Sequence, residues 1–417
     1  MNSETGNHGY RDVLAELTRR LQEPAPGRLQ LLTGPRQVGK TTALLALAET
    51  FKPNATYAAA DAPESWLPGW WDALWQETER RARTSSGQYL LLLDEIQVLP
   101  DWGRQLKSQM DRVVREKLPL HVVVSGSSAL QLGSGAKETM AGRFEKMRLL
   151  HWSAAELAAV FGLPEEEAVQ QVVRFGSFPG ATALVATPAR WRDYIRDSIV
   201  EPAIGRDLLA LEQVRKPGLL RQLFAVCAGH PAEILSLQKI SGQLQDKGAL
   251  ETLSHYLHLL EEACLIAGIP KYSEKPIRQR AAPVKVVCLN NAFLSAFSPI
   301  GPPDPGRDPA TWGRWVENAC IAHAWNSGQR VCYWRQEPLE VDLVLDGSWG
   351  CWAVEVKTGA FHARDLAGVL EFCRAFPKFR PLVLCDRGAE RAADRAGVAW
   401  RHWQDYLLRG ITSTLLD

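Results

Sequence analysis

One segment places glycine, lysine and threonine at the spacing that binds nucleotide phosphates. Residues 34–41 read Gly-Pro-Arg-Gln-Val-Gly-Lys-Thr and fit the pattern GxxxxGK[ST]. Backbone N–H groups of such a loop surround the phosphates, while Lys40 reaches the outer phosphates and Thr41 binds Mg²⁺. We therefore expect ATP and Mg²⁺ as ligands. The loop residues expected at the nucleotide are Gly34, Pro35, Arg36, Gln37, Val38, Gly39, Lys40, Thr41 and Thr42.

Two carboxylates follow the apolar run at residues 90–93. Asp94 is expected to hold Mg²⁺ through water, and Glu95 is placed to polarise the water that attacks the γ-phosphate. The alternative is a merely polar exit from a strand. Beside a phosphate-binding loop the catalytic interpretation is favoured, so the pair predicts ATP hydrolysis as well as ATP binding.

Two further features could serve the same reaction. Residues 125–128 read Ser-Gly-Ser-Ser and offer hydroxyls at a strand end, where a γ-phosphate sensor would lie, although serines also form ordinary turns. Arg143 could stabilise the transition state from within the chain or from a neighbouring subunit. A plain surface arginine is the alternative for Arg143.

A second constellation lies near the C-terminus and consists of Glu317, Asp342, Glu355 and Lys357. Side chains two apart on a strand point to the same face, so Glu355 and Lys357 should be presented together. The strand that starts near Asp342 can add a further carboxylate beside them. A solvated strand face is the alternative explanation of these charges.

The elements that must position these groups can be read from the apolar pattern. Buried runs at 29–33, 89–93 and 121–124 alternate with helical stretches such as 41–51, which predicts a parallel α/β sheet in the first 150 residues. From 153 to about 297 the pattern is almost wholly helical, including one helix over 191–211. A Pro/Gly linker at 298–306 predicts a domain boundary, after which a helix at 312–327 and strands at 330–334, 341–345, 352–357 and 381–384 form a smaller α/β unit.

The middle of the chain suggests a nucleic-acid contact. Helices at 236–246 and 249–265, joined by Lys247-Gly248, fit a helix-turn-helix. Five basic residues against Glu274 then give residues 271–285 a local charge of about +4, which could meet DNA phosphates. A solvated loop or a protein-binding module is the alternative. The basic residues are Lys271, Lys275, Arg278, Arg280 and Lys285.

Four tryptophans fall between residues 65 and 75. A helix that begins near Pro68 would place Trp71 and Trp75 on one face, since residues four apart are neighbours on a helix. Packing against the sheet or a neighbouring element is favoured over base stacking.

Taken together, these segments resemble AAA-type bacterial and archaeal ATPases that carry a C-terminal DUF4143 domain. The resemblance rests on the loop at 33–42, on Leu-Asp-Glu-Ile-Gln at 93–97, on 125–128, on Ala-Gly-Arg-Phe at 141–144 with 149–157, and on Phe-Gly-Ser-Phe-Pro-Gly at 175–180 with 194–208. Asn290-Asn291 stands where the family tends to have an aspartate.

The resemblance implies an α/β fold with an AAA-type P-loop sheet over residues 1–150. It also implies a helical lid (151–212), a winged-helix-like segment (213–298) and a domain similar to PD-(D/E)XK nucleases (307–417). In such a domain Asp342 and Glu355 would bind Mg²⁺, Glu317 would support the metal, and Lys357 would position the attacking water.

Composition restricts the partners. The 417 residues contain 48 Lys and Arg against 47 Asp and Glu, so the chain is not a strongly basic nucleic-acid binder overall. The N-terminus is polar and no apolar run reaches about 18 residues, so we expect a cytoplasmic protein without a membrane partner. The first hypothesis is an ATPase that acts on or binds DNA. The alternative is an ATP-gated switch or scaffold for a protein partner with a non-cleaving C-terminal domain, and a homo-oligomer is compatible with both.

Overall fold

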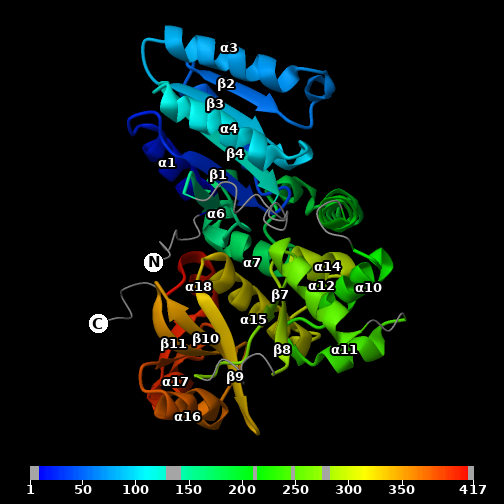
Figure 1. Cartoon of the computed structure of the whole chain (residues 1–417). Coiled ribbons are helices and arrows are strands. Elements are labelled where there is room, and N and C mark those ends of the chain that lie inside the picture. The colour runs from blue at the N-terminus through cyan, green and yellow to red at the C-terminus, as the bar shows by residue number, and fades with distance from the viewer. Residues whose placement is uncertain (1–8, 128–141, 210–213, 246–248, 275–281, 412–417) are drawn as a thin grey trace. The chain divides into compact units, whose positions relative to one another are not determined.

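The computed structural model describes residues 9–127, 142–209, 214–245, 249–274 and 282–411. The chain forms two compact units, one of residues 1–150 with 205–214 and the other of residues 151–204 with 215–417 (Figure 1). The linker at 298–306 lies inside the second unit and does not separate compact units. Residues 205–214 belong with the first unit, although the expected helical lid (151–212) includes most of them.

The first unit contains a parallel sheet of five strands, which confirms the predicted α/β class. Two of its strands were not predicted, because β2 is only half-buried throughout and β5 has one fully buried residue, so neither shows an apolar run. In sheet order the strands are β2 (Ala55–Ala59), β3 (Tyr89–Asp94), β4 (Leu120–Ser127), β1 (Leu29–Gly34) and β5 (Phe144–Arg148).

Helices cover both faces of this sheet. Successive residues of β3 alternate between the faces: Leu90 and Leu92 pack with α1 and α2, whereas Leu91 and Leu93 pack with α3 and α4. A strand buried on both sides explains the unbroken leucine run. The helices are α1 (Tyr10–Leu21), α2 (Lys40–Thr50), α3 (Trp70–Thr84) and α4 (Trp102–Arg115), with short turns η1 (Pro63–Trp66) and η2 (Ile96–Val98).

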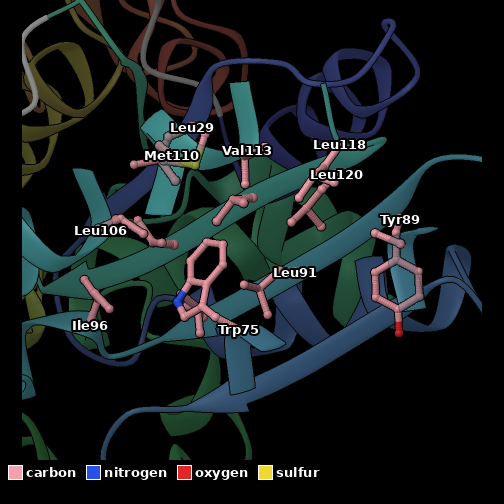
Figure 2. Packing of buried hydrophobic residues seen from close by; sticks show 14 of the residues in the cluster. Leu29, Trp75, Tyr89, Leu91, Ile96, Leu106, Met110, Val113, Leu118 and Leu120 are labelled. Carbon is pink, nitrogen blue, oxygen red and sulfur yellow. The ribbon is translucent and has the colours of Figure 1, made fainter. Parts of the chain in front are cut away.

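The tryptophan-rich segment contributes to this core. Trp75 is fully buried, and Figure 2 shows its ring beside Leu91, with Leu106 and Val113 of α4 in the same cluster. The Trp71 ring packs against it with 5.7 Å between ring centroids. The predicted packing role is confirmed for this pair.

The second unit begins with helices that follow the prediction closely. The N-terminus of α6 has a capping box, in which Ser153 and Glu156 satisfy each other's backbone N–H groups. The single helix expected from residue 191 begins as α8 and then continues mainly as π-helical turns, and its expected end at 211 lies outside the described residues. These elements are α6 (Ala154–Phe161), α7 (Glu165–Phe175), η4 (Pro179–Leu184), α8 (Pro188–Asp193), η5 (Tyr194–Val200) and η6 (Ala203–Leu208).

The middle of the chain is less helical than the apolar pattern predicted. It contains an antiparallel sheet in the order β6-β8-β7. Strand β7 was missed because residues 263–269 continue the apolar pattern of α12 without a break. The turn at Lys247-Gly248 and residues 275–281 lie outside the described residues. The elements are α10 (Pro217–Ala228), β6 (Glu233–Leu235), α11 (Leu237–Gln243), α12 (Leu250–Glu262), β7 (Ile266–Ile269), β8 (Val284–Cys288) and α14 (Ala292–Phe297).

The C-terminal sheet has the order β13-β12-β11-β10-β9 and is mixed: β9, β10 and β11 are antiparallel, while β11, β12 and β13 are parallel. All four predicted strands are present. Phe372 of α16 packs on one face against Val383 and Val344. The strands are β9 (Arg330–Gln336), β10 (Leu339–Gly347), β11 (Gly350–Lys357), β12 (Arg380–Cys385) and β13 (Ala399–His402), and the helices are α15 (Pro309–Asn326), η7 (Ala363–Leu366), α16 (Ala367–Ala375), α17 (Glu390–Ala396) and α18 (Trp403–Arg409).

Within the described ranges, every helix is too short or too polar to cross a lipid bilayer.

Candidate functional site

The predicted phosphate-binding loop connects β1 to α2, as a P-loop requires. Gly39 immediately precedes the helix with φ of 100°, and Gln37 also has a positive φ of 60°. A Cβ on Gly34 would lie 1.9 Å from the carbonyl oxygen of Leu149, so only glycine fits there. The loop conformation therefore depends on its glycines.

Lys40 is buried beneath this loop. Its Nζ donates hydrogen bonds to the carbonyl oxygens of Gly34 (3.0 Å) and Pro35 (2.7 Å). Burial lowers the pKa of Lys40, and the nearby carboxylates of Glu95 and Asp94 oppose that shift. Phosphate oxygens can replace these two carbonyl oxygens as acceptors for Lys40 Nζ. The buried ammonium would then remain paired.

Asp94 ends β3 and is held from two sides. Tyr57 OH donates to its Oδ2 at 3.0 Å, and Ser125 Oγ donates to its Oδ1. Burial, reinforced by the charge of Asp94, raises the pKa of Tyr57. Glu95 follows with a left-handed φ of 51°, a strained conformation that turns the chain at the end of the strand.

The serines after β4 differ in their contacts. Ser125 is engaged by Asp94, whereas Ser127 Oγ is buried without a hydrogen-bond partner among the described residues. Ser127 pairs in register with Gly34, at the start of the phosphate-binding loop. Ser128 lies outside the described residues.

A cavity of about 450 Å³ joins the loop to the carboxylates. It brings together Arg36, Thr41, Asp94 and Glu95 as predicted. By contrast, Val38 packs in the core, and Thr42 is exposed and does not line the cavity. The residues that line it are Arg36, Thr41, Tyr57, Asp61, Asp94, Glu95, Gln97, Val98, Arg206 and Asp207.

Several lining residues were missed by the sequence reasoning. Tyr57 lies near the carboxyl end of β2, and Asp61 follows that strand. A prediction of β2 would have placed both residues at this edge of the sheet, because the carboxyl ends of parallel strands lie together. Arg206 and Asp207 come from far along the chain, and no local pattern marks them as cavity residues. Asp207 holds the Arg36 guanidinium by two hydrogen bonds.

Arg143 does not contribute to this cavity. It immediately precedes β5, and its Nε bonds to Asp111 Oδ1 at 2.8 Å on an exposed surface. Phe144 pairs with Leu29 at the amino end of β1, whereas the phosphate-binding loop follows the carboxyl end. A strand of six residues spans about 17 Å, so the expectation of a finger acting within the chain is wrong. Action from a neighbouring subunit stays a prediction.

The C-terminal constellation does come together. Lys357 Nζ lies 2.7 Å from Glu355 Oε1, as predicted for residues two apart on β11. Asp342 lies on the neighbouring strand β10, and its Oδ2 accepts a hydrogen bond from the Val356 N–H at 2.9 Å. Glu317 of α15 is linked to Asp342 by a lysine that lies between the two carboxylates. The sequence had placed this lysine in the basic run.

That residue is Lys285 of β8. Its side chain is buried, so the expected contact of Lys285 with DNA phosphates is wrong. Its Nζ lies 2.7 Å from Glu317 Oε1 and 3.4 Å from Asp342 Oδ1. Burial alone would lower the pKa of Lys285, but the carboxylates of Glu317, Asp342 and Glu340 together raise it. Of the predicted basic run, residues 275–281 lie outside the described residues.

These residues do not fit the expected metal site. An ammonium occupies the position between Glu317 and Asp342, and both oxygens of Asp342 already have partners. Among the described residues, no group of three or more His, Cys, Asp or Glu side chains is arranged to hold a metal ion. The metal roles expected for Asp342 and Glu355, with Glu317 in support, are therefore not supported by the geometry.

Asn290, which departs from the family pattern, has a structural role. Its Nδ2 donates to Ser177 Oγ (3.2 Å) and contacts His151 Nδ1 (3.1 Å), while its Oδ1 accepts from the N–H groups of Ser177 (3.2 Å) and Ala292 (3.0 Å). An amide can donate and accept at once, which an ionised carboxylate cannot. Asn290 thus ties residues 175–180 to the segment after β8.

Comparisons with known families cover most of the chain. Residues 27–158 match AAA_14, an AAA domain, residues 166–304 match a domain of unknown function, DUF8612, and residues 312–401 match the domain of unknown function DUF4143. The last two families carry no assigned activity.

Relatives and solved structures add little beyond the fold. Uncharacterized proteins of Mycobacterium bovis and Mycobacterium tuberculosis are each 27% identical over 83% of this chain and 73% of their own length. AMPPCP-bound DnaA from Aquifex aeolicus is 14% identical, with coverage of 66% of this chain and 90% of that chain, but the TM-score is only 0.34. Residues 27–158 thus form an AAA domain with a P-loop sheet, and residues 312–401 match the DUF4143 domain.

Proposed function

We propose that the first unit binds and hydrolyses ATP in an Mg²⁺-dependent manner. The observation that carries the proposal is the single cavity in which Thr41, Asp94 and Glu95 meet at the mouth of the phosphate-binding loop. A loop that binds phosphates, a hydroxyl and carboxylate pair for Mg²⁺, and a second carboxylate for water are the parts that ATP hydrolysis needs.

Each residue has a distinct part in this proposal. Lys40 exchanges its two carbonyl partners for phosphate oxygens, and Ser127, whose buried hydroxyl has no partner among the described residues, donates to the γ-phosphate. Thr41 and Asp94 would hold Mg²⁺, which neutralises phosphate charge when bound. Glu95 orients the attacking water and accepts its proton.

Substitution of Lys40 tests the binding half of the proposal. Lys40→Ala should weaken binding of a fluorescent ATP analogue at least about tenfold, because the charge that reaches the phosphates is lost. Lys52→Ala is the matched control, since Lys52 is exposed and pairs with Glu49 on the surface. Unchanged nucleotide affinity in Lys40→Ala would refute the assignment.

For the coupled partner we retain two candidates. DNA is supported by the basic residues of the sequence at 271–280, although burial of Lys285 weakens that support. A protein partner, gated by ATP and bound through a non-cleaving C-terminal domain, is supported by the ammonium that fills the acidic cluster. If duplex DNA stimulates ATP turnover and the stimulation falls steeply between 50 and 200 mM salt, DNA is favoured.

Self-assembly is proposed only through Arg143. Its guanidinium lies on an exposed surface beside Asp111, where a neighbouring subunit could meet it. An oligomer that uses Arg143 in this way would lose ATP turnover on Arg143→Ala, and its turnover per subunit would rise with protein concentration. An ATP turnover that changes neither with Arg143→Ala nor with protein concentration would contradict assembly through this residue.

A further inference from the structure

The acidic cluster of the second unit contains its own cation. Lys285 enters from β8, and its Nζ contacts Glu317 Oε1 of α15 at 2.7 Å, Glu340 Oε1 of β10 at 3.1 Å and Asp342 Oδ1 of β10 at 3.4 Å. The ammonium from the β6-β8-β7 sheet therefore contacts carboxylates of helix α15 and of strand β10 in the C-terminal sheet. The ammonium donates hydrogen bonds to Glu317 and Asp342 and forms an ion pair with Glu340.

This contact is structural rather than incidental. The Lys285 side chain is 1% exposed, while those of Glu317 and Asp342 are 17% and 12% exposed. Burying a charge is strongly unfavourable unless it is paired and hydrogen-bonded. Lys285 and the carboxylates thus satisfy each other, and neither side can be removed without leaving a buried charge.

Three of the four oxygens of Asp342 and Glu355 have hydrogen-bond partners. Asp342 Oδ2 accepts from the Val356 N–H, and Glu355 Oε1 accepts from Lys357 Nζ. The fourth, Glu355 Oε2, is buried without a hydrogen-bond partner among the described residues. A divalent cation needs several oxygens at about 2.0–2.6 Å, and both oxygens of the central Asp342 are already engaged by Lys285 and the Val356 N–H.

We propose that Lys285 takes the place of a divalent metal in the acidic cluster formed by Glu317, Glu340, Asp342 and Glu355. The cluster joins the β6-β8-β7 sheet to the C-terminal sheet as a buried ion pair, and it does not bind Mg²⁺ or Mn²⁺. The C-terminal domain consequently cannot use a metal at these residues to cleave phosphodiesters. This inference is independent of the proposed ATPase site, whose residues belong to the other unit.

Mn²⁺ titration monitored by electron paramagnetic resonance tests the proposal on the full chain without nucleotide. All proteins carry Asp94→Asn, which removes the Mg²⁺ carboxylate of the nucleotide cavity. Addition of Asp342→Asn should leave the number of bound Mn²⁺ ions unchanged, because Asp342 holds Lys285 and not a metal. A bound Mn²⁺ that disappears with Asp342→Asn would overturn the proposal. Glu317→Gln provides the same comparison if Asp342→Asn does not fold.

A stability cycle tests the ion pair itself. Lys285→Met should lower the urea midpoint of unfolding because it leaves carboxylates buried without their cation. Asp342→Asn should lower the urea midpoint less in the Lys285→Met background than in the wild type. In that background the Asp342 carboxylate has already lost its partner. Lys378→Met and Asp346→Asn, from a pair 53% and 33% exposed, should be nearly additive. Additive losses for Lys285 and Asp342 would contradict the pairing.

Discussion

Arg36 and Asp207 are 171 positions apart, yet they form a two-point ion pair in the nucleotide cavity. Arg36 Nε lies 2.6 Å from Asp207 Oδ2, and Arg36 Nη2 lies 2.6 Å from Oδ1. The hydrogen bonds to Asp207 raise the pKa of the Arg36 guanidinium. A planar guanidinium facing a carboxylate is the strongest geometry for such a pair. It connects residues 205–214 to the phosphate-binding loop.

Removal of this pair should be costly because both side chains are largely buried, at 24% and 9% exposed. We expect Asp207→Ala to lower the free energy of unfolding by about 1–3 kcal/mol. The loss should be measured by urea denaturation of the wild type, the two single variants and Arg36→Ala/Asp207→Ala.

The double variant and an exposed pair serve as controls. The double variant should lose clearly less than the sum of the single losses. Arg80 and Glu77, 62% and 45% exposed, should show a coupling of only about 0.2–0.5 kcal/mol. Equal couplings for the two pairs would argue against a special role of Asp207.

Gly34 should tolerate no side chain. A Cβ there would lie 1.9 Å from the Leu149 carbonyl oxygen, so Gly34→Ala must displace backbone at the loop. We expect the free energy of unfolding to fall by about 1–3 kcal/mol, together with weaker nucleotide binding.

Gly87 provides the matched glycine. Its nearest neighbour for an added Cβ is Asn54 Nδ2 at 4.0 Å. Gly87→Ala should therefore change stability by no more than about 0.5 kcal/mol. Comparable losses at the two glycines, measured by urea denaturation, would show that the close approach to Leu149 is unimportant.

Acid should destabilise the second unit through His151. Burial lowers the pKa of His151 to about 4 in the folded protein, against about 6.5 when unfolded. The unfolded chain therefore takes up a proton first as the pH falls, and stability is lost between about pH 6.5 and pH 4. The loss attributable to one such group is at most about 3 kcal/mol.

Urea midpoints measured at intervals from pH 7 to pH 4.5 should reveal this loss. His151→Gln should reduce the pH dependence without abolishing it, because burial also lowers the pKa of His323 in the same unit to about 4. His258→Gln, at an exposed position of α12, should leave the dependence as in the wild type. A pH dependence that is identical in all three proteins would contradict the assignment to His151.

Much of the proposed ATP site could be predicted from the sequence because its signals are local. The loop at 34–41 and the carboxylates after Leu93 each follow a buried strand, and parallel strands bring their ends together. The cavity residues Arg206 and Asp207 could not be predicted, because their place depends on how residues 205–214 return to the first unit.

The C-terminal cluster illustrates the same limit. The two-residue period of a strand was sufficient to pair Glu355 with Lys357. Lys285 was grouped with a basic run, since nothing in its neighbourhood indicates that β8 turns it into a buried cluster of carboxylates. The expectation that Arg143 acts within the chain was wrong for a related reason. Strand β5 was not predicted, and it places Arg143 at the amino end of β1, away from the phosphate-binding loop.

The most direct measurement is the steady-state rate of ATP hydrolysis by wild type and Glu95→Gln in the presence of Mg²⁺. Glu95 lines the cavity beside Asp94 and is the carboxylate assigned to the attacking water. Glu95→Gln should bind ATP about as tightly as the wild type. Its rate of ATP hydrolysis should be lower by a factor of about 100 or more. Glu64→Gln, at an exposed position of η1, should behave as the wild type. Wild-type turnover by Glu95→Gln would contradict the proposed catalytic site.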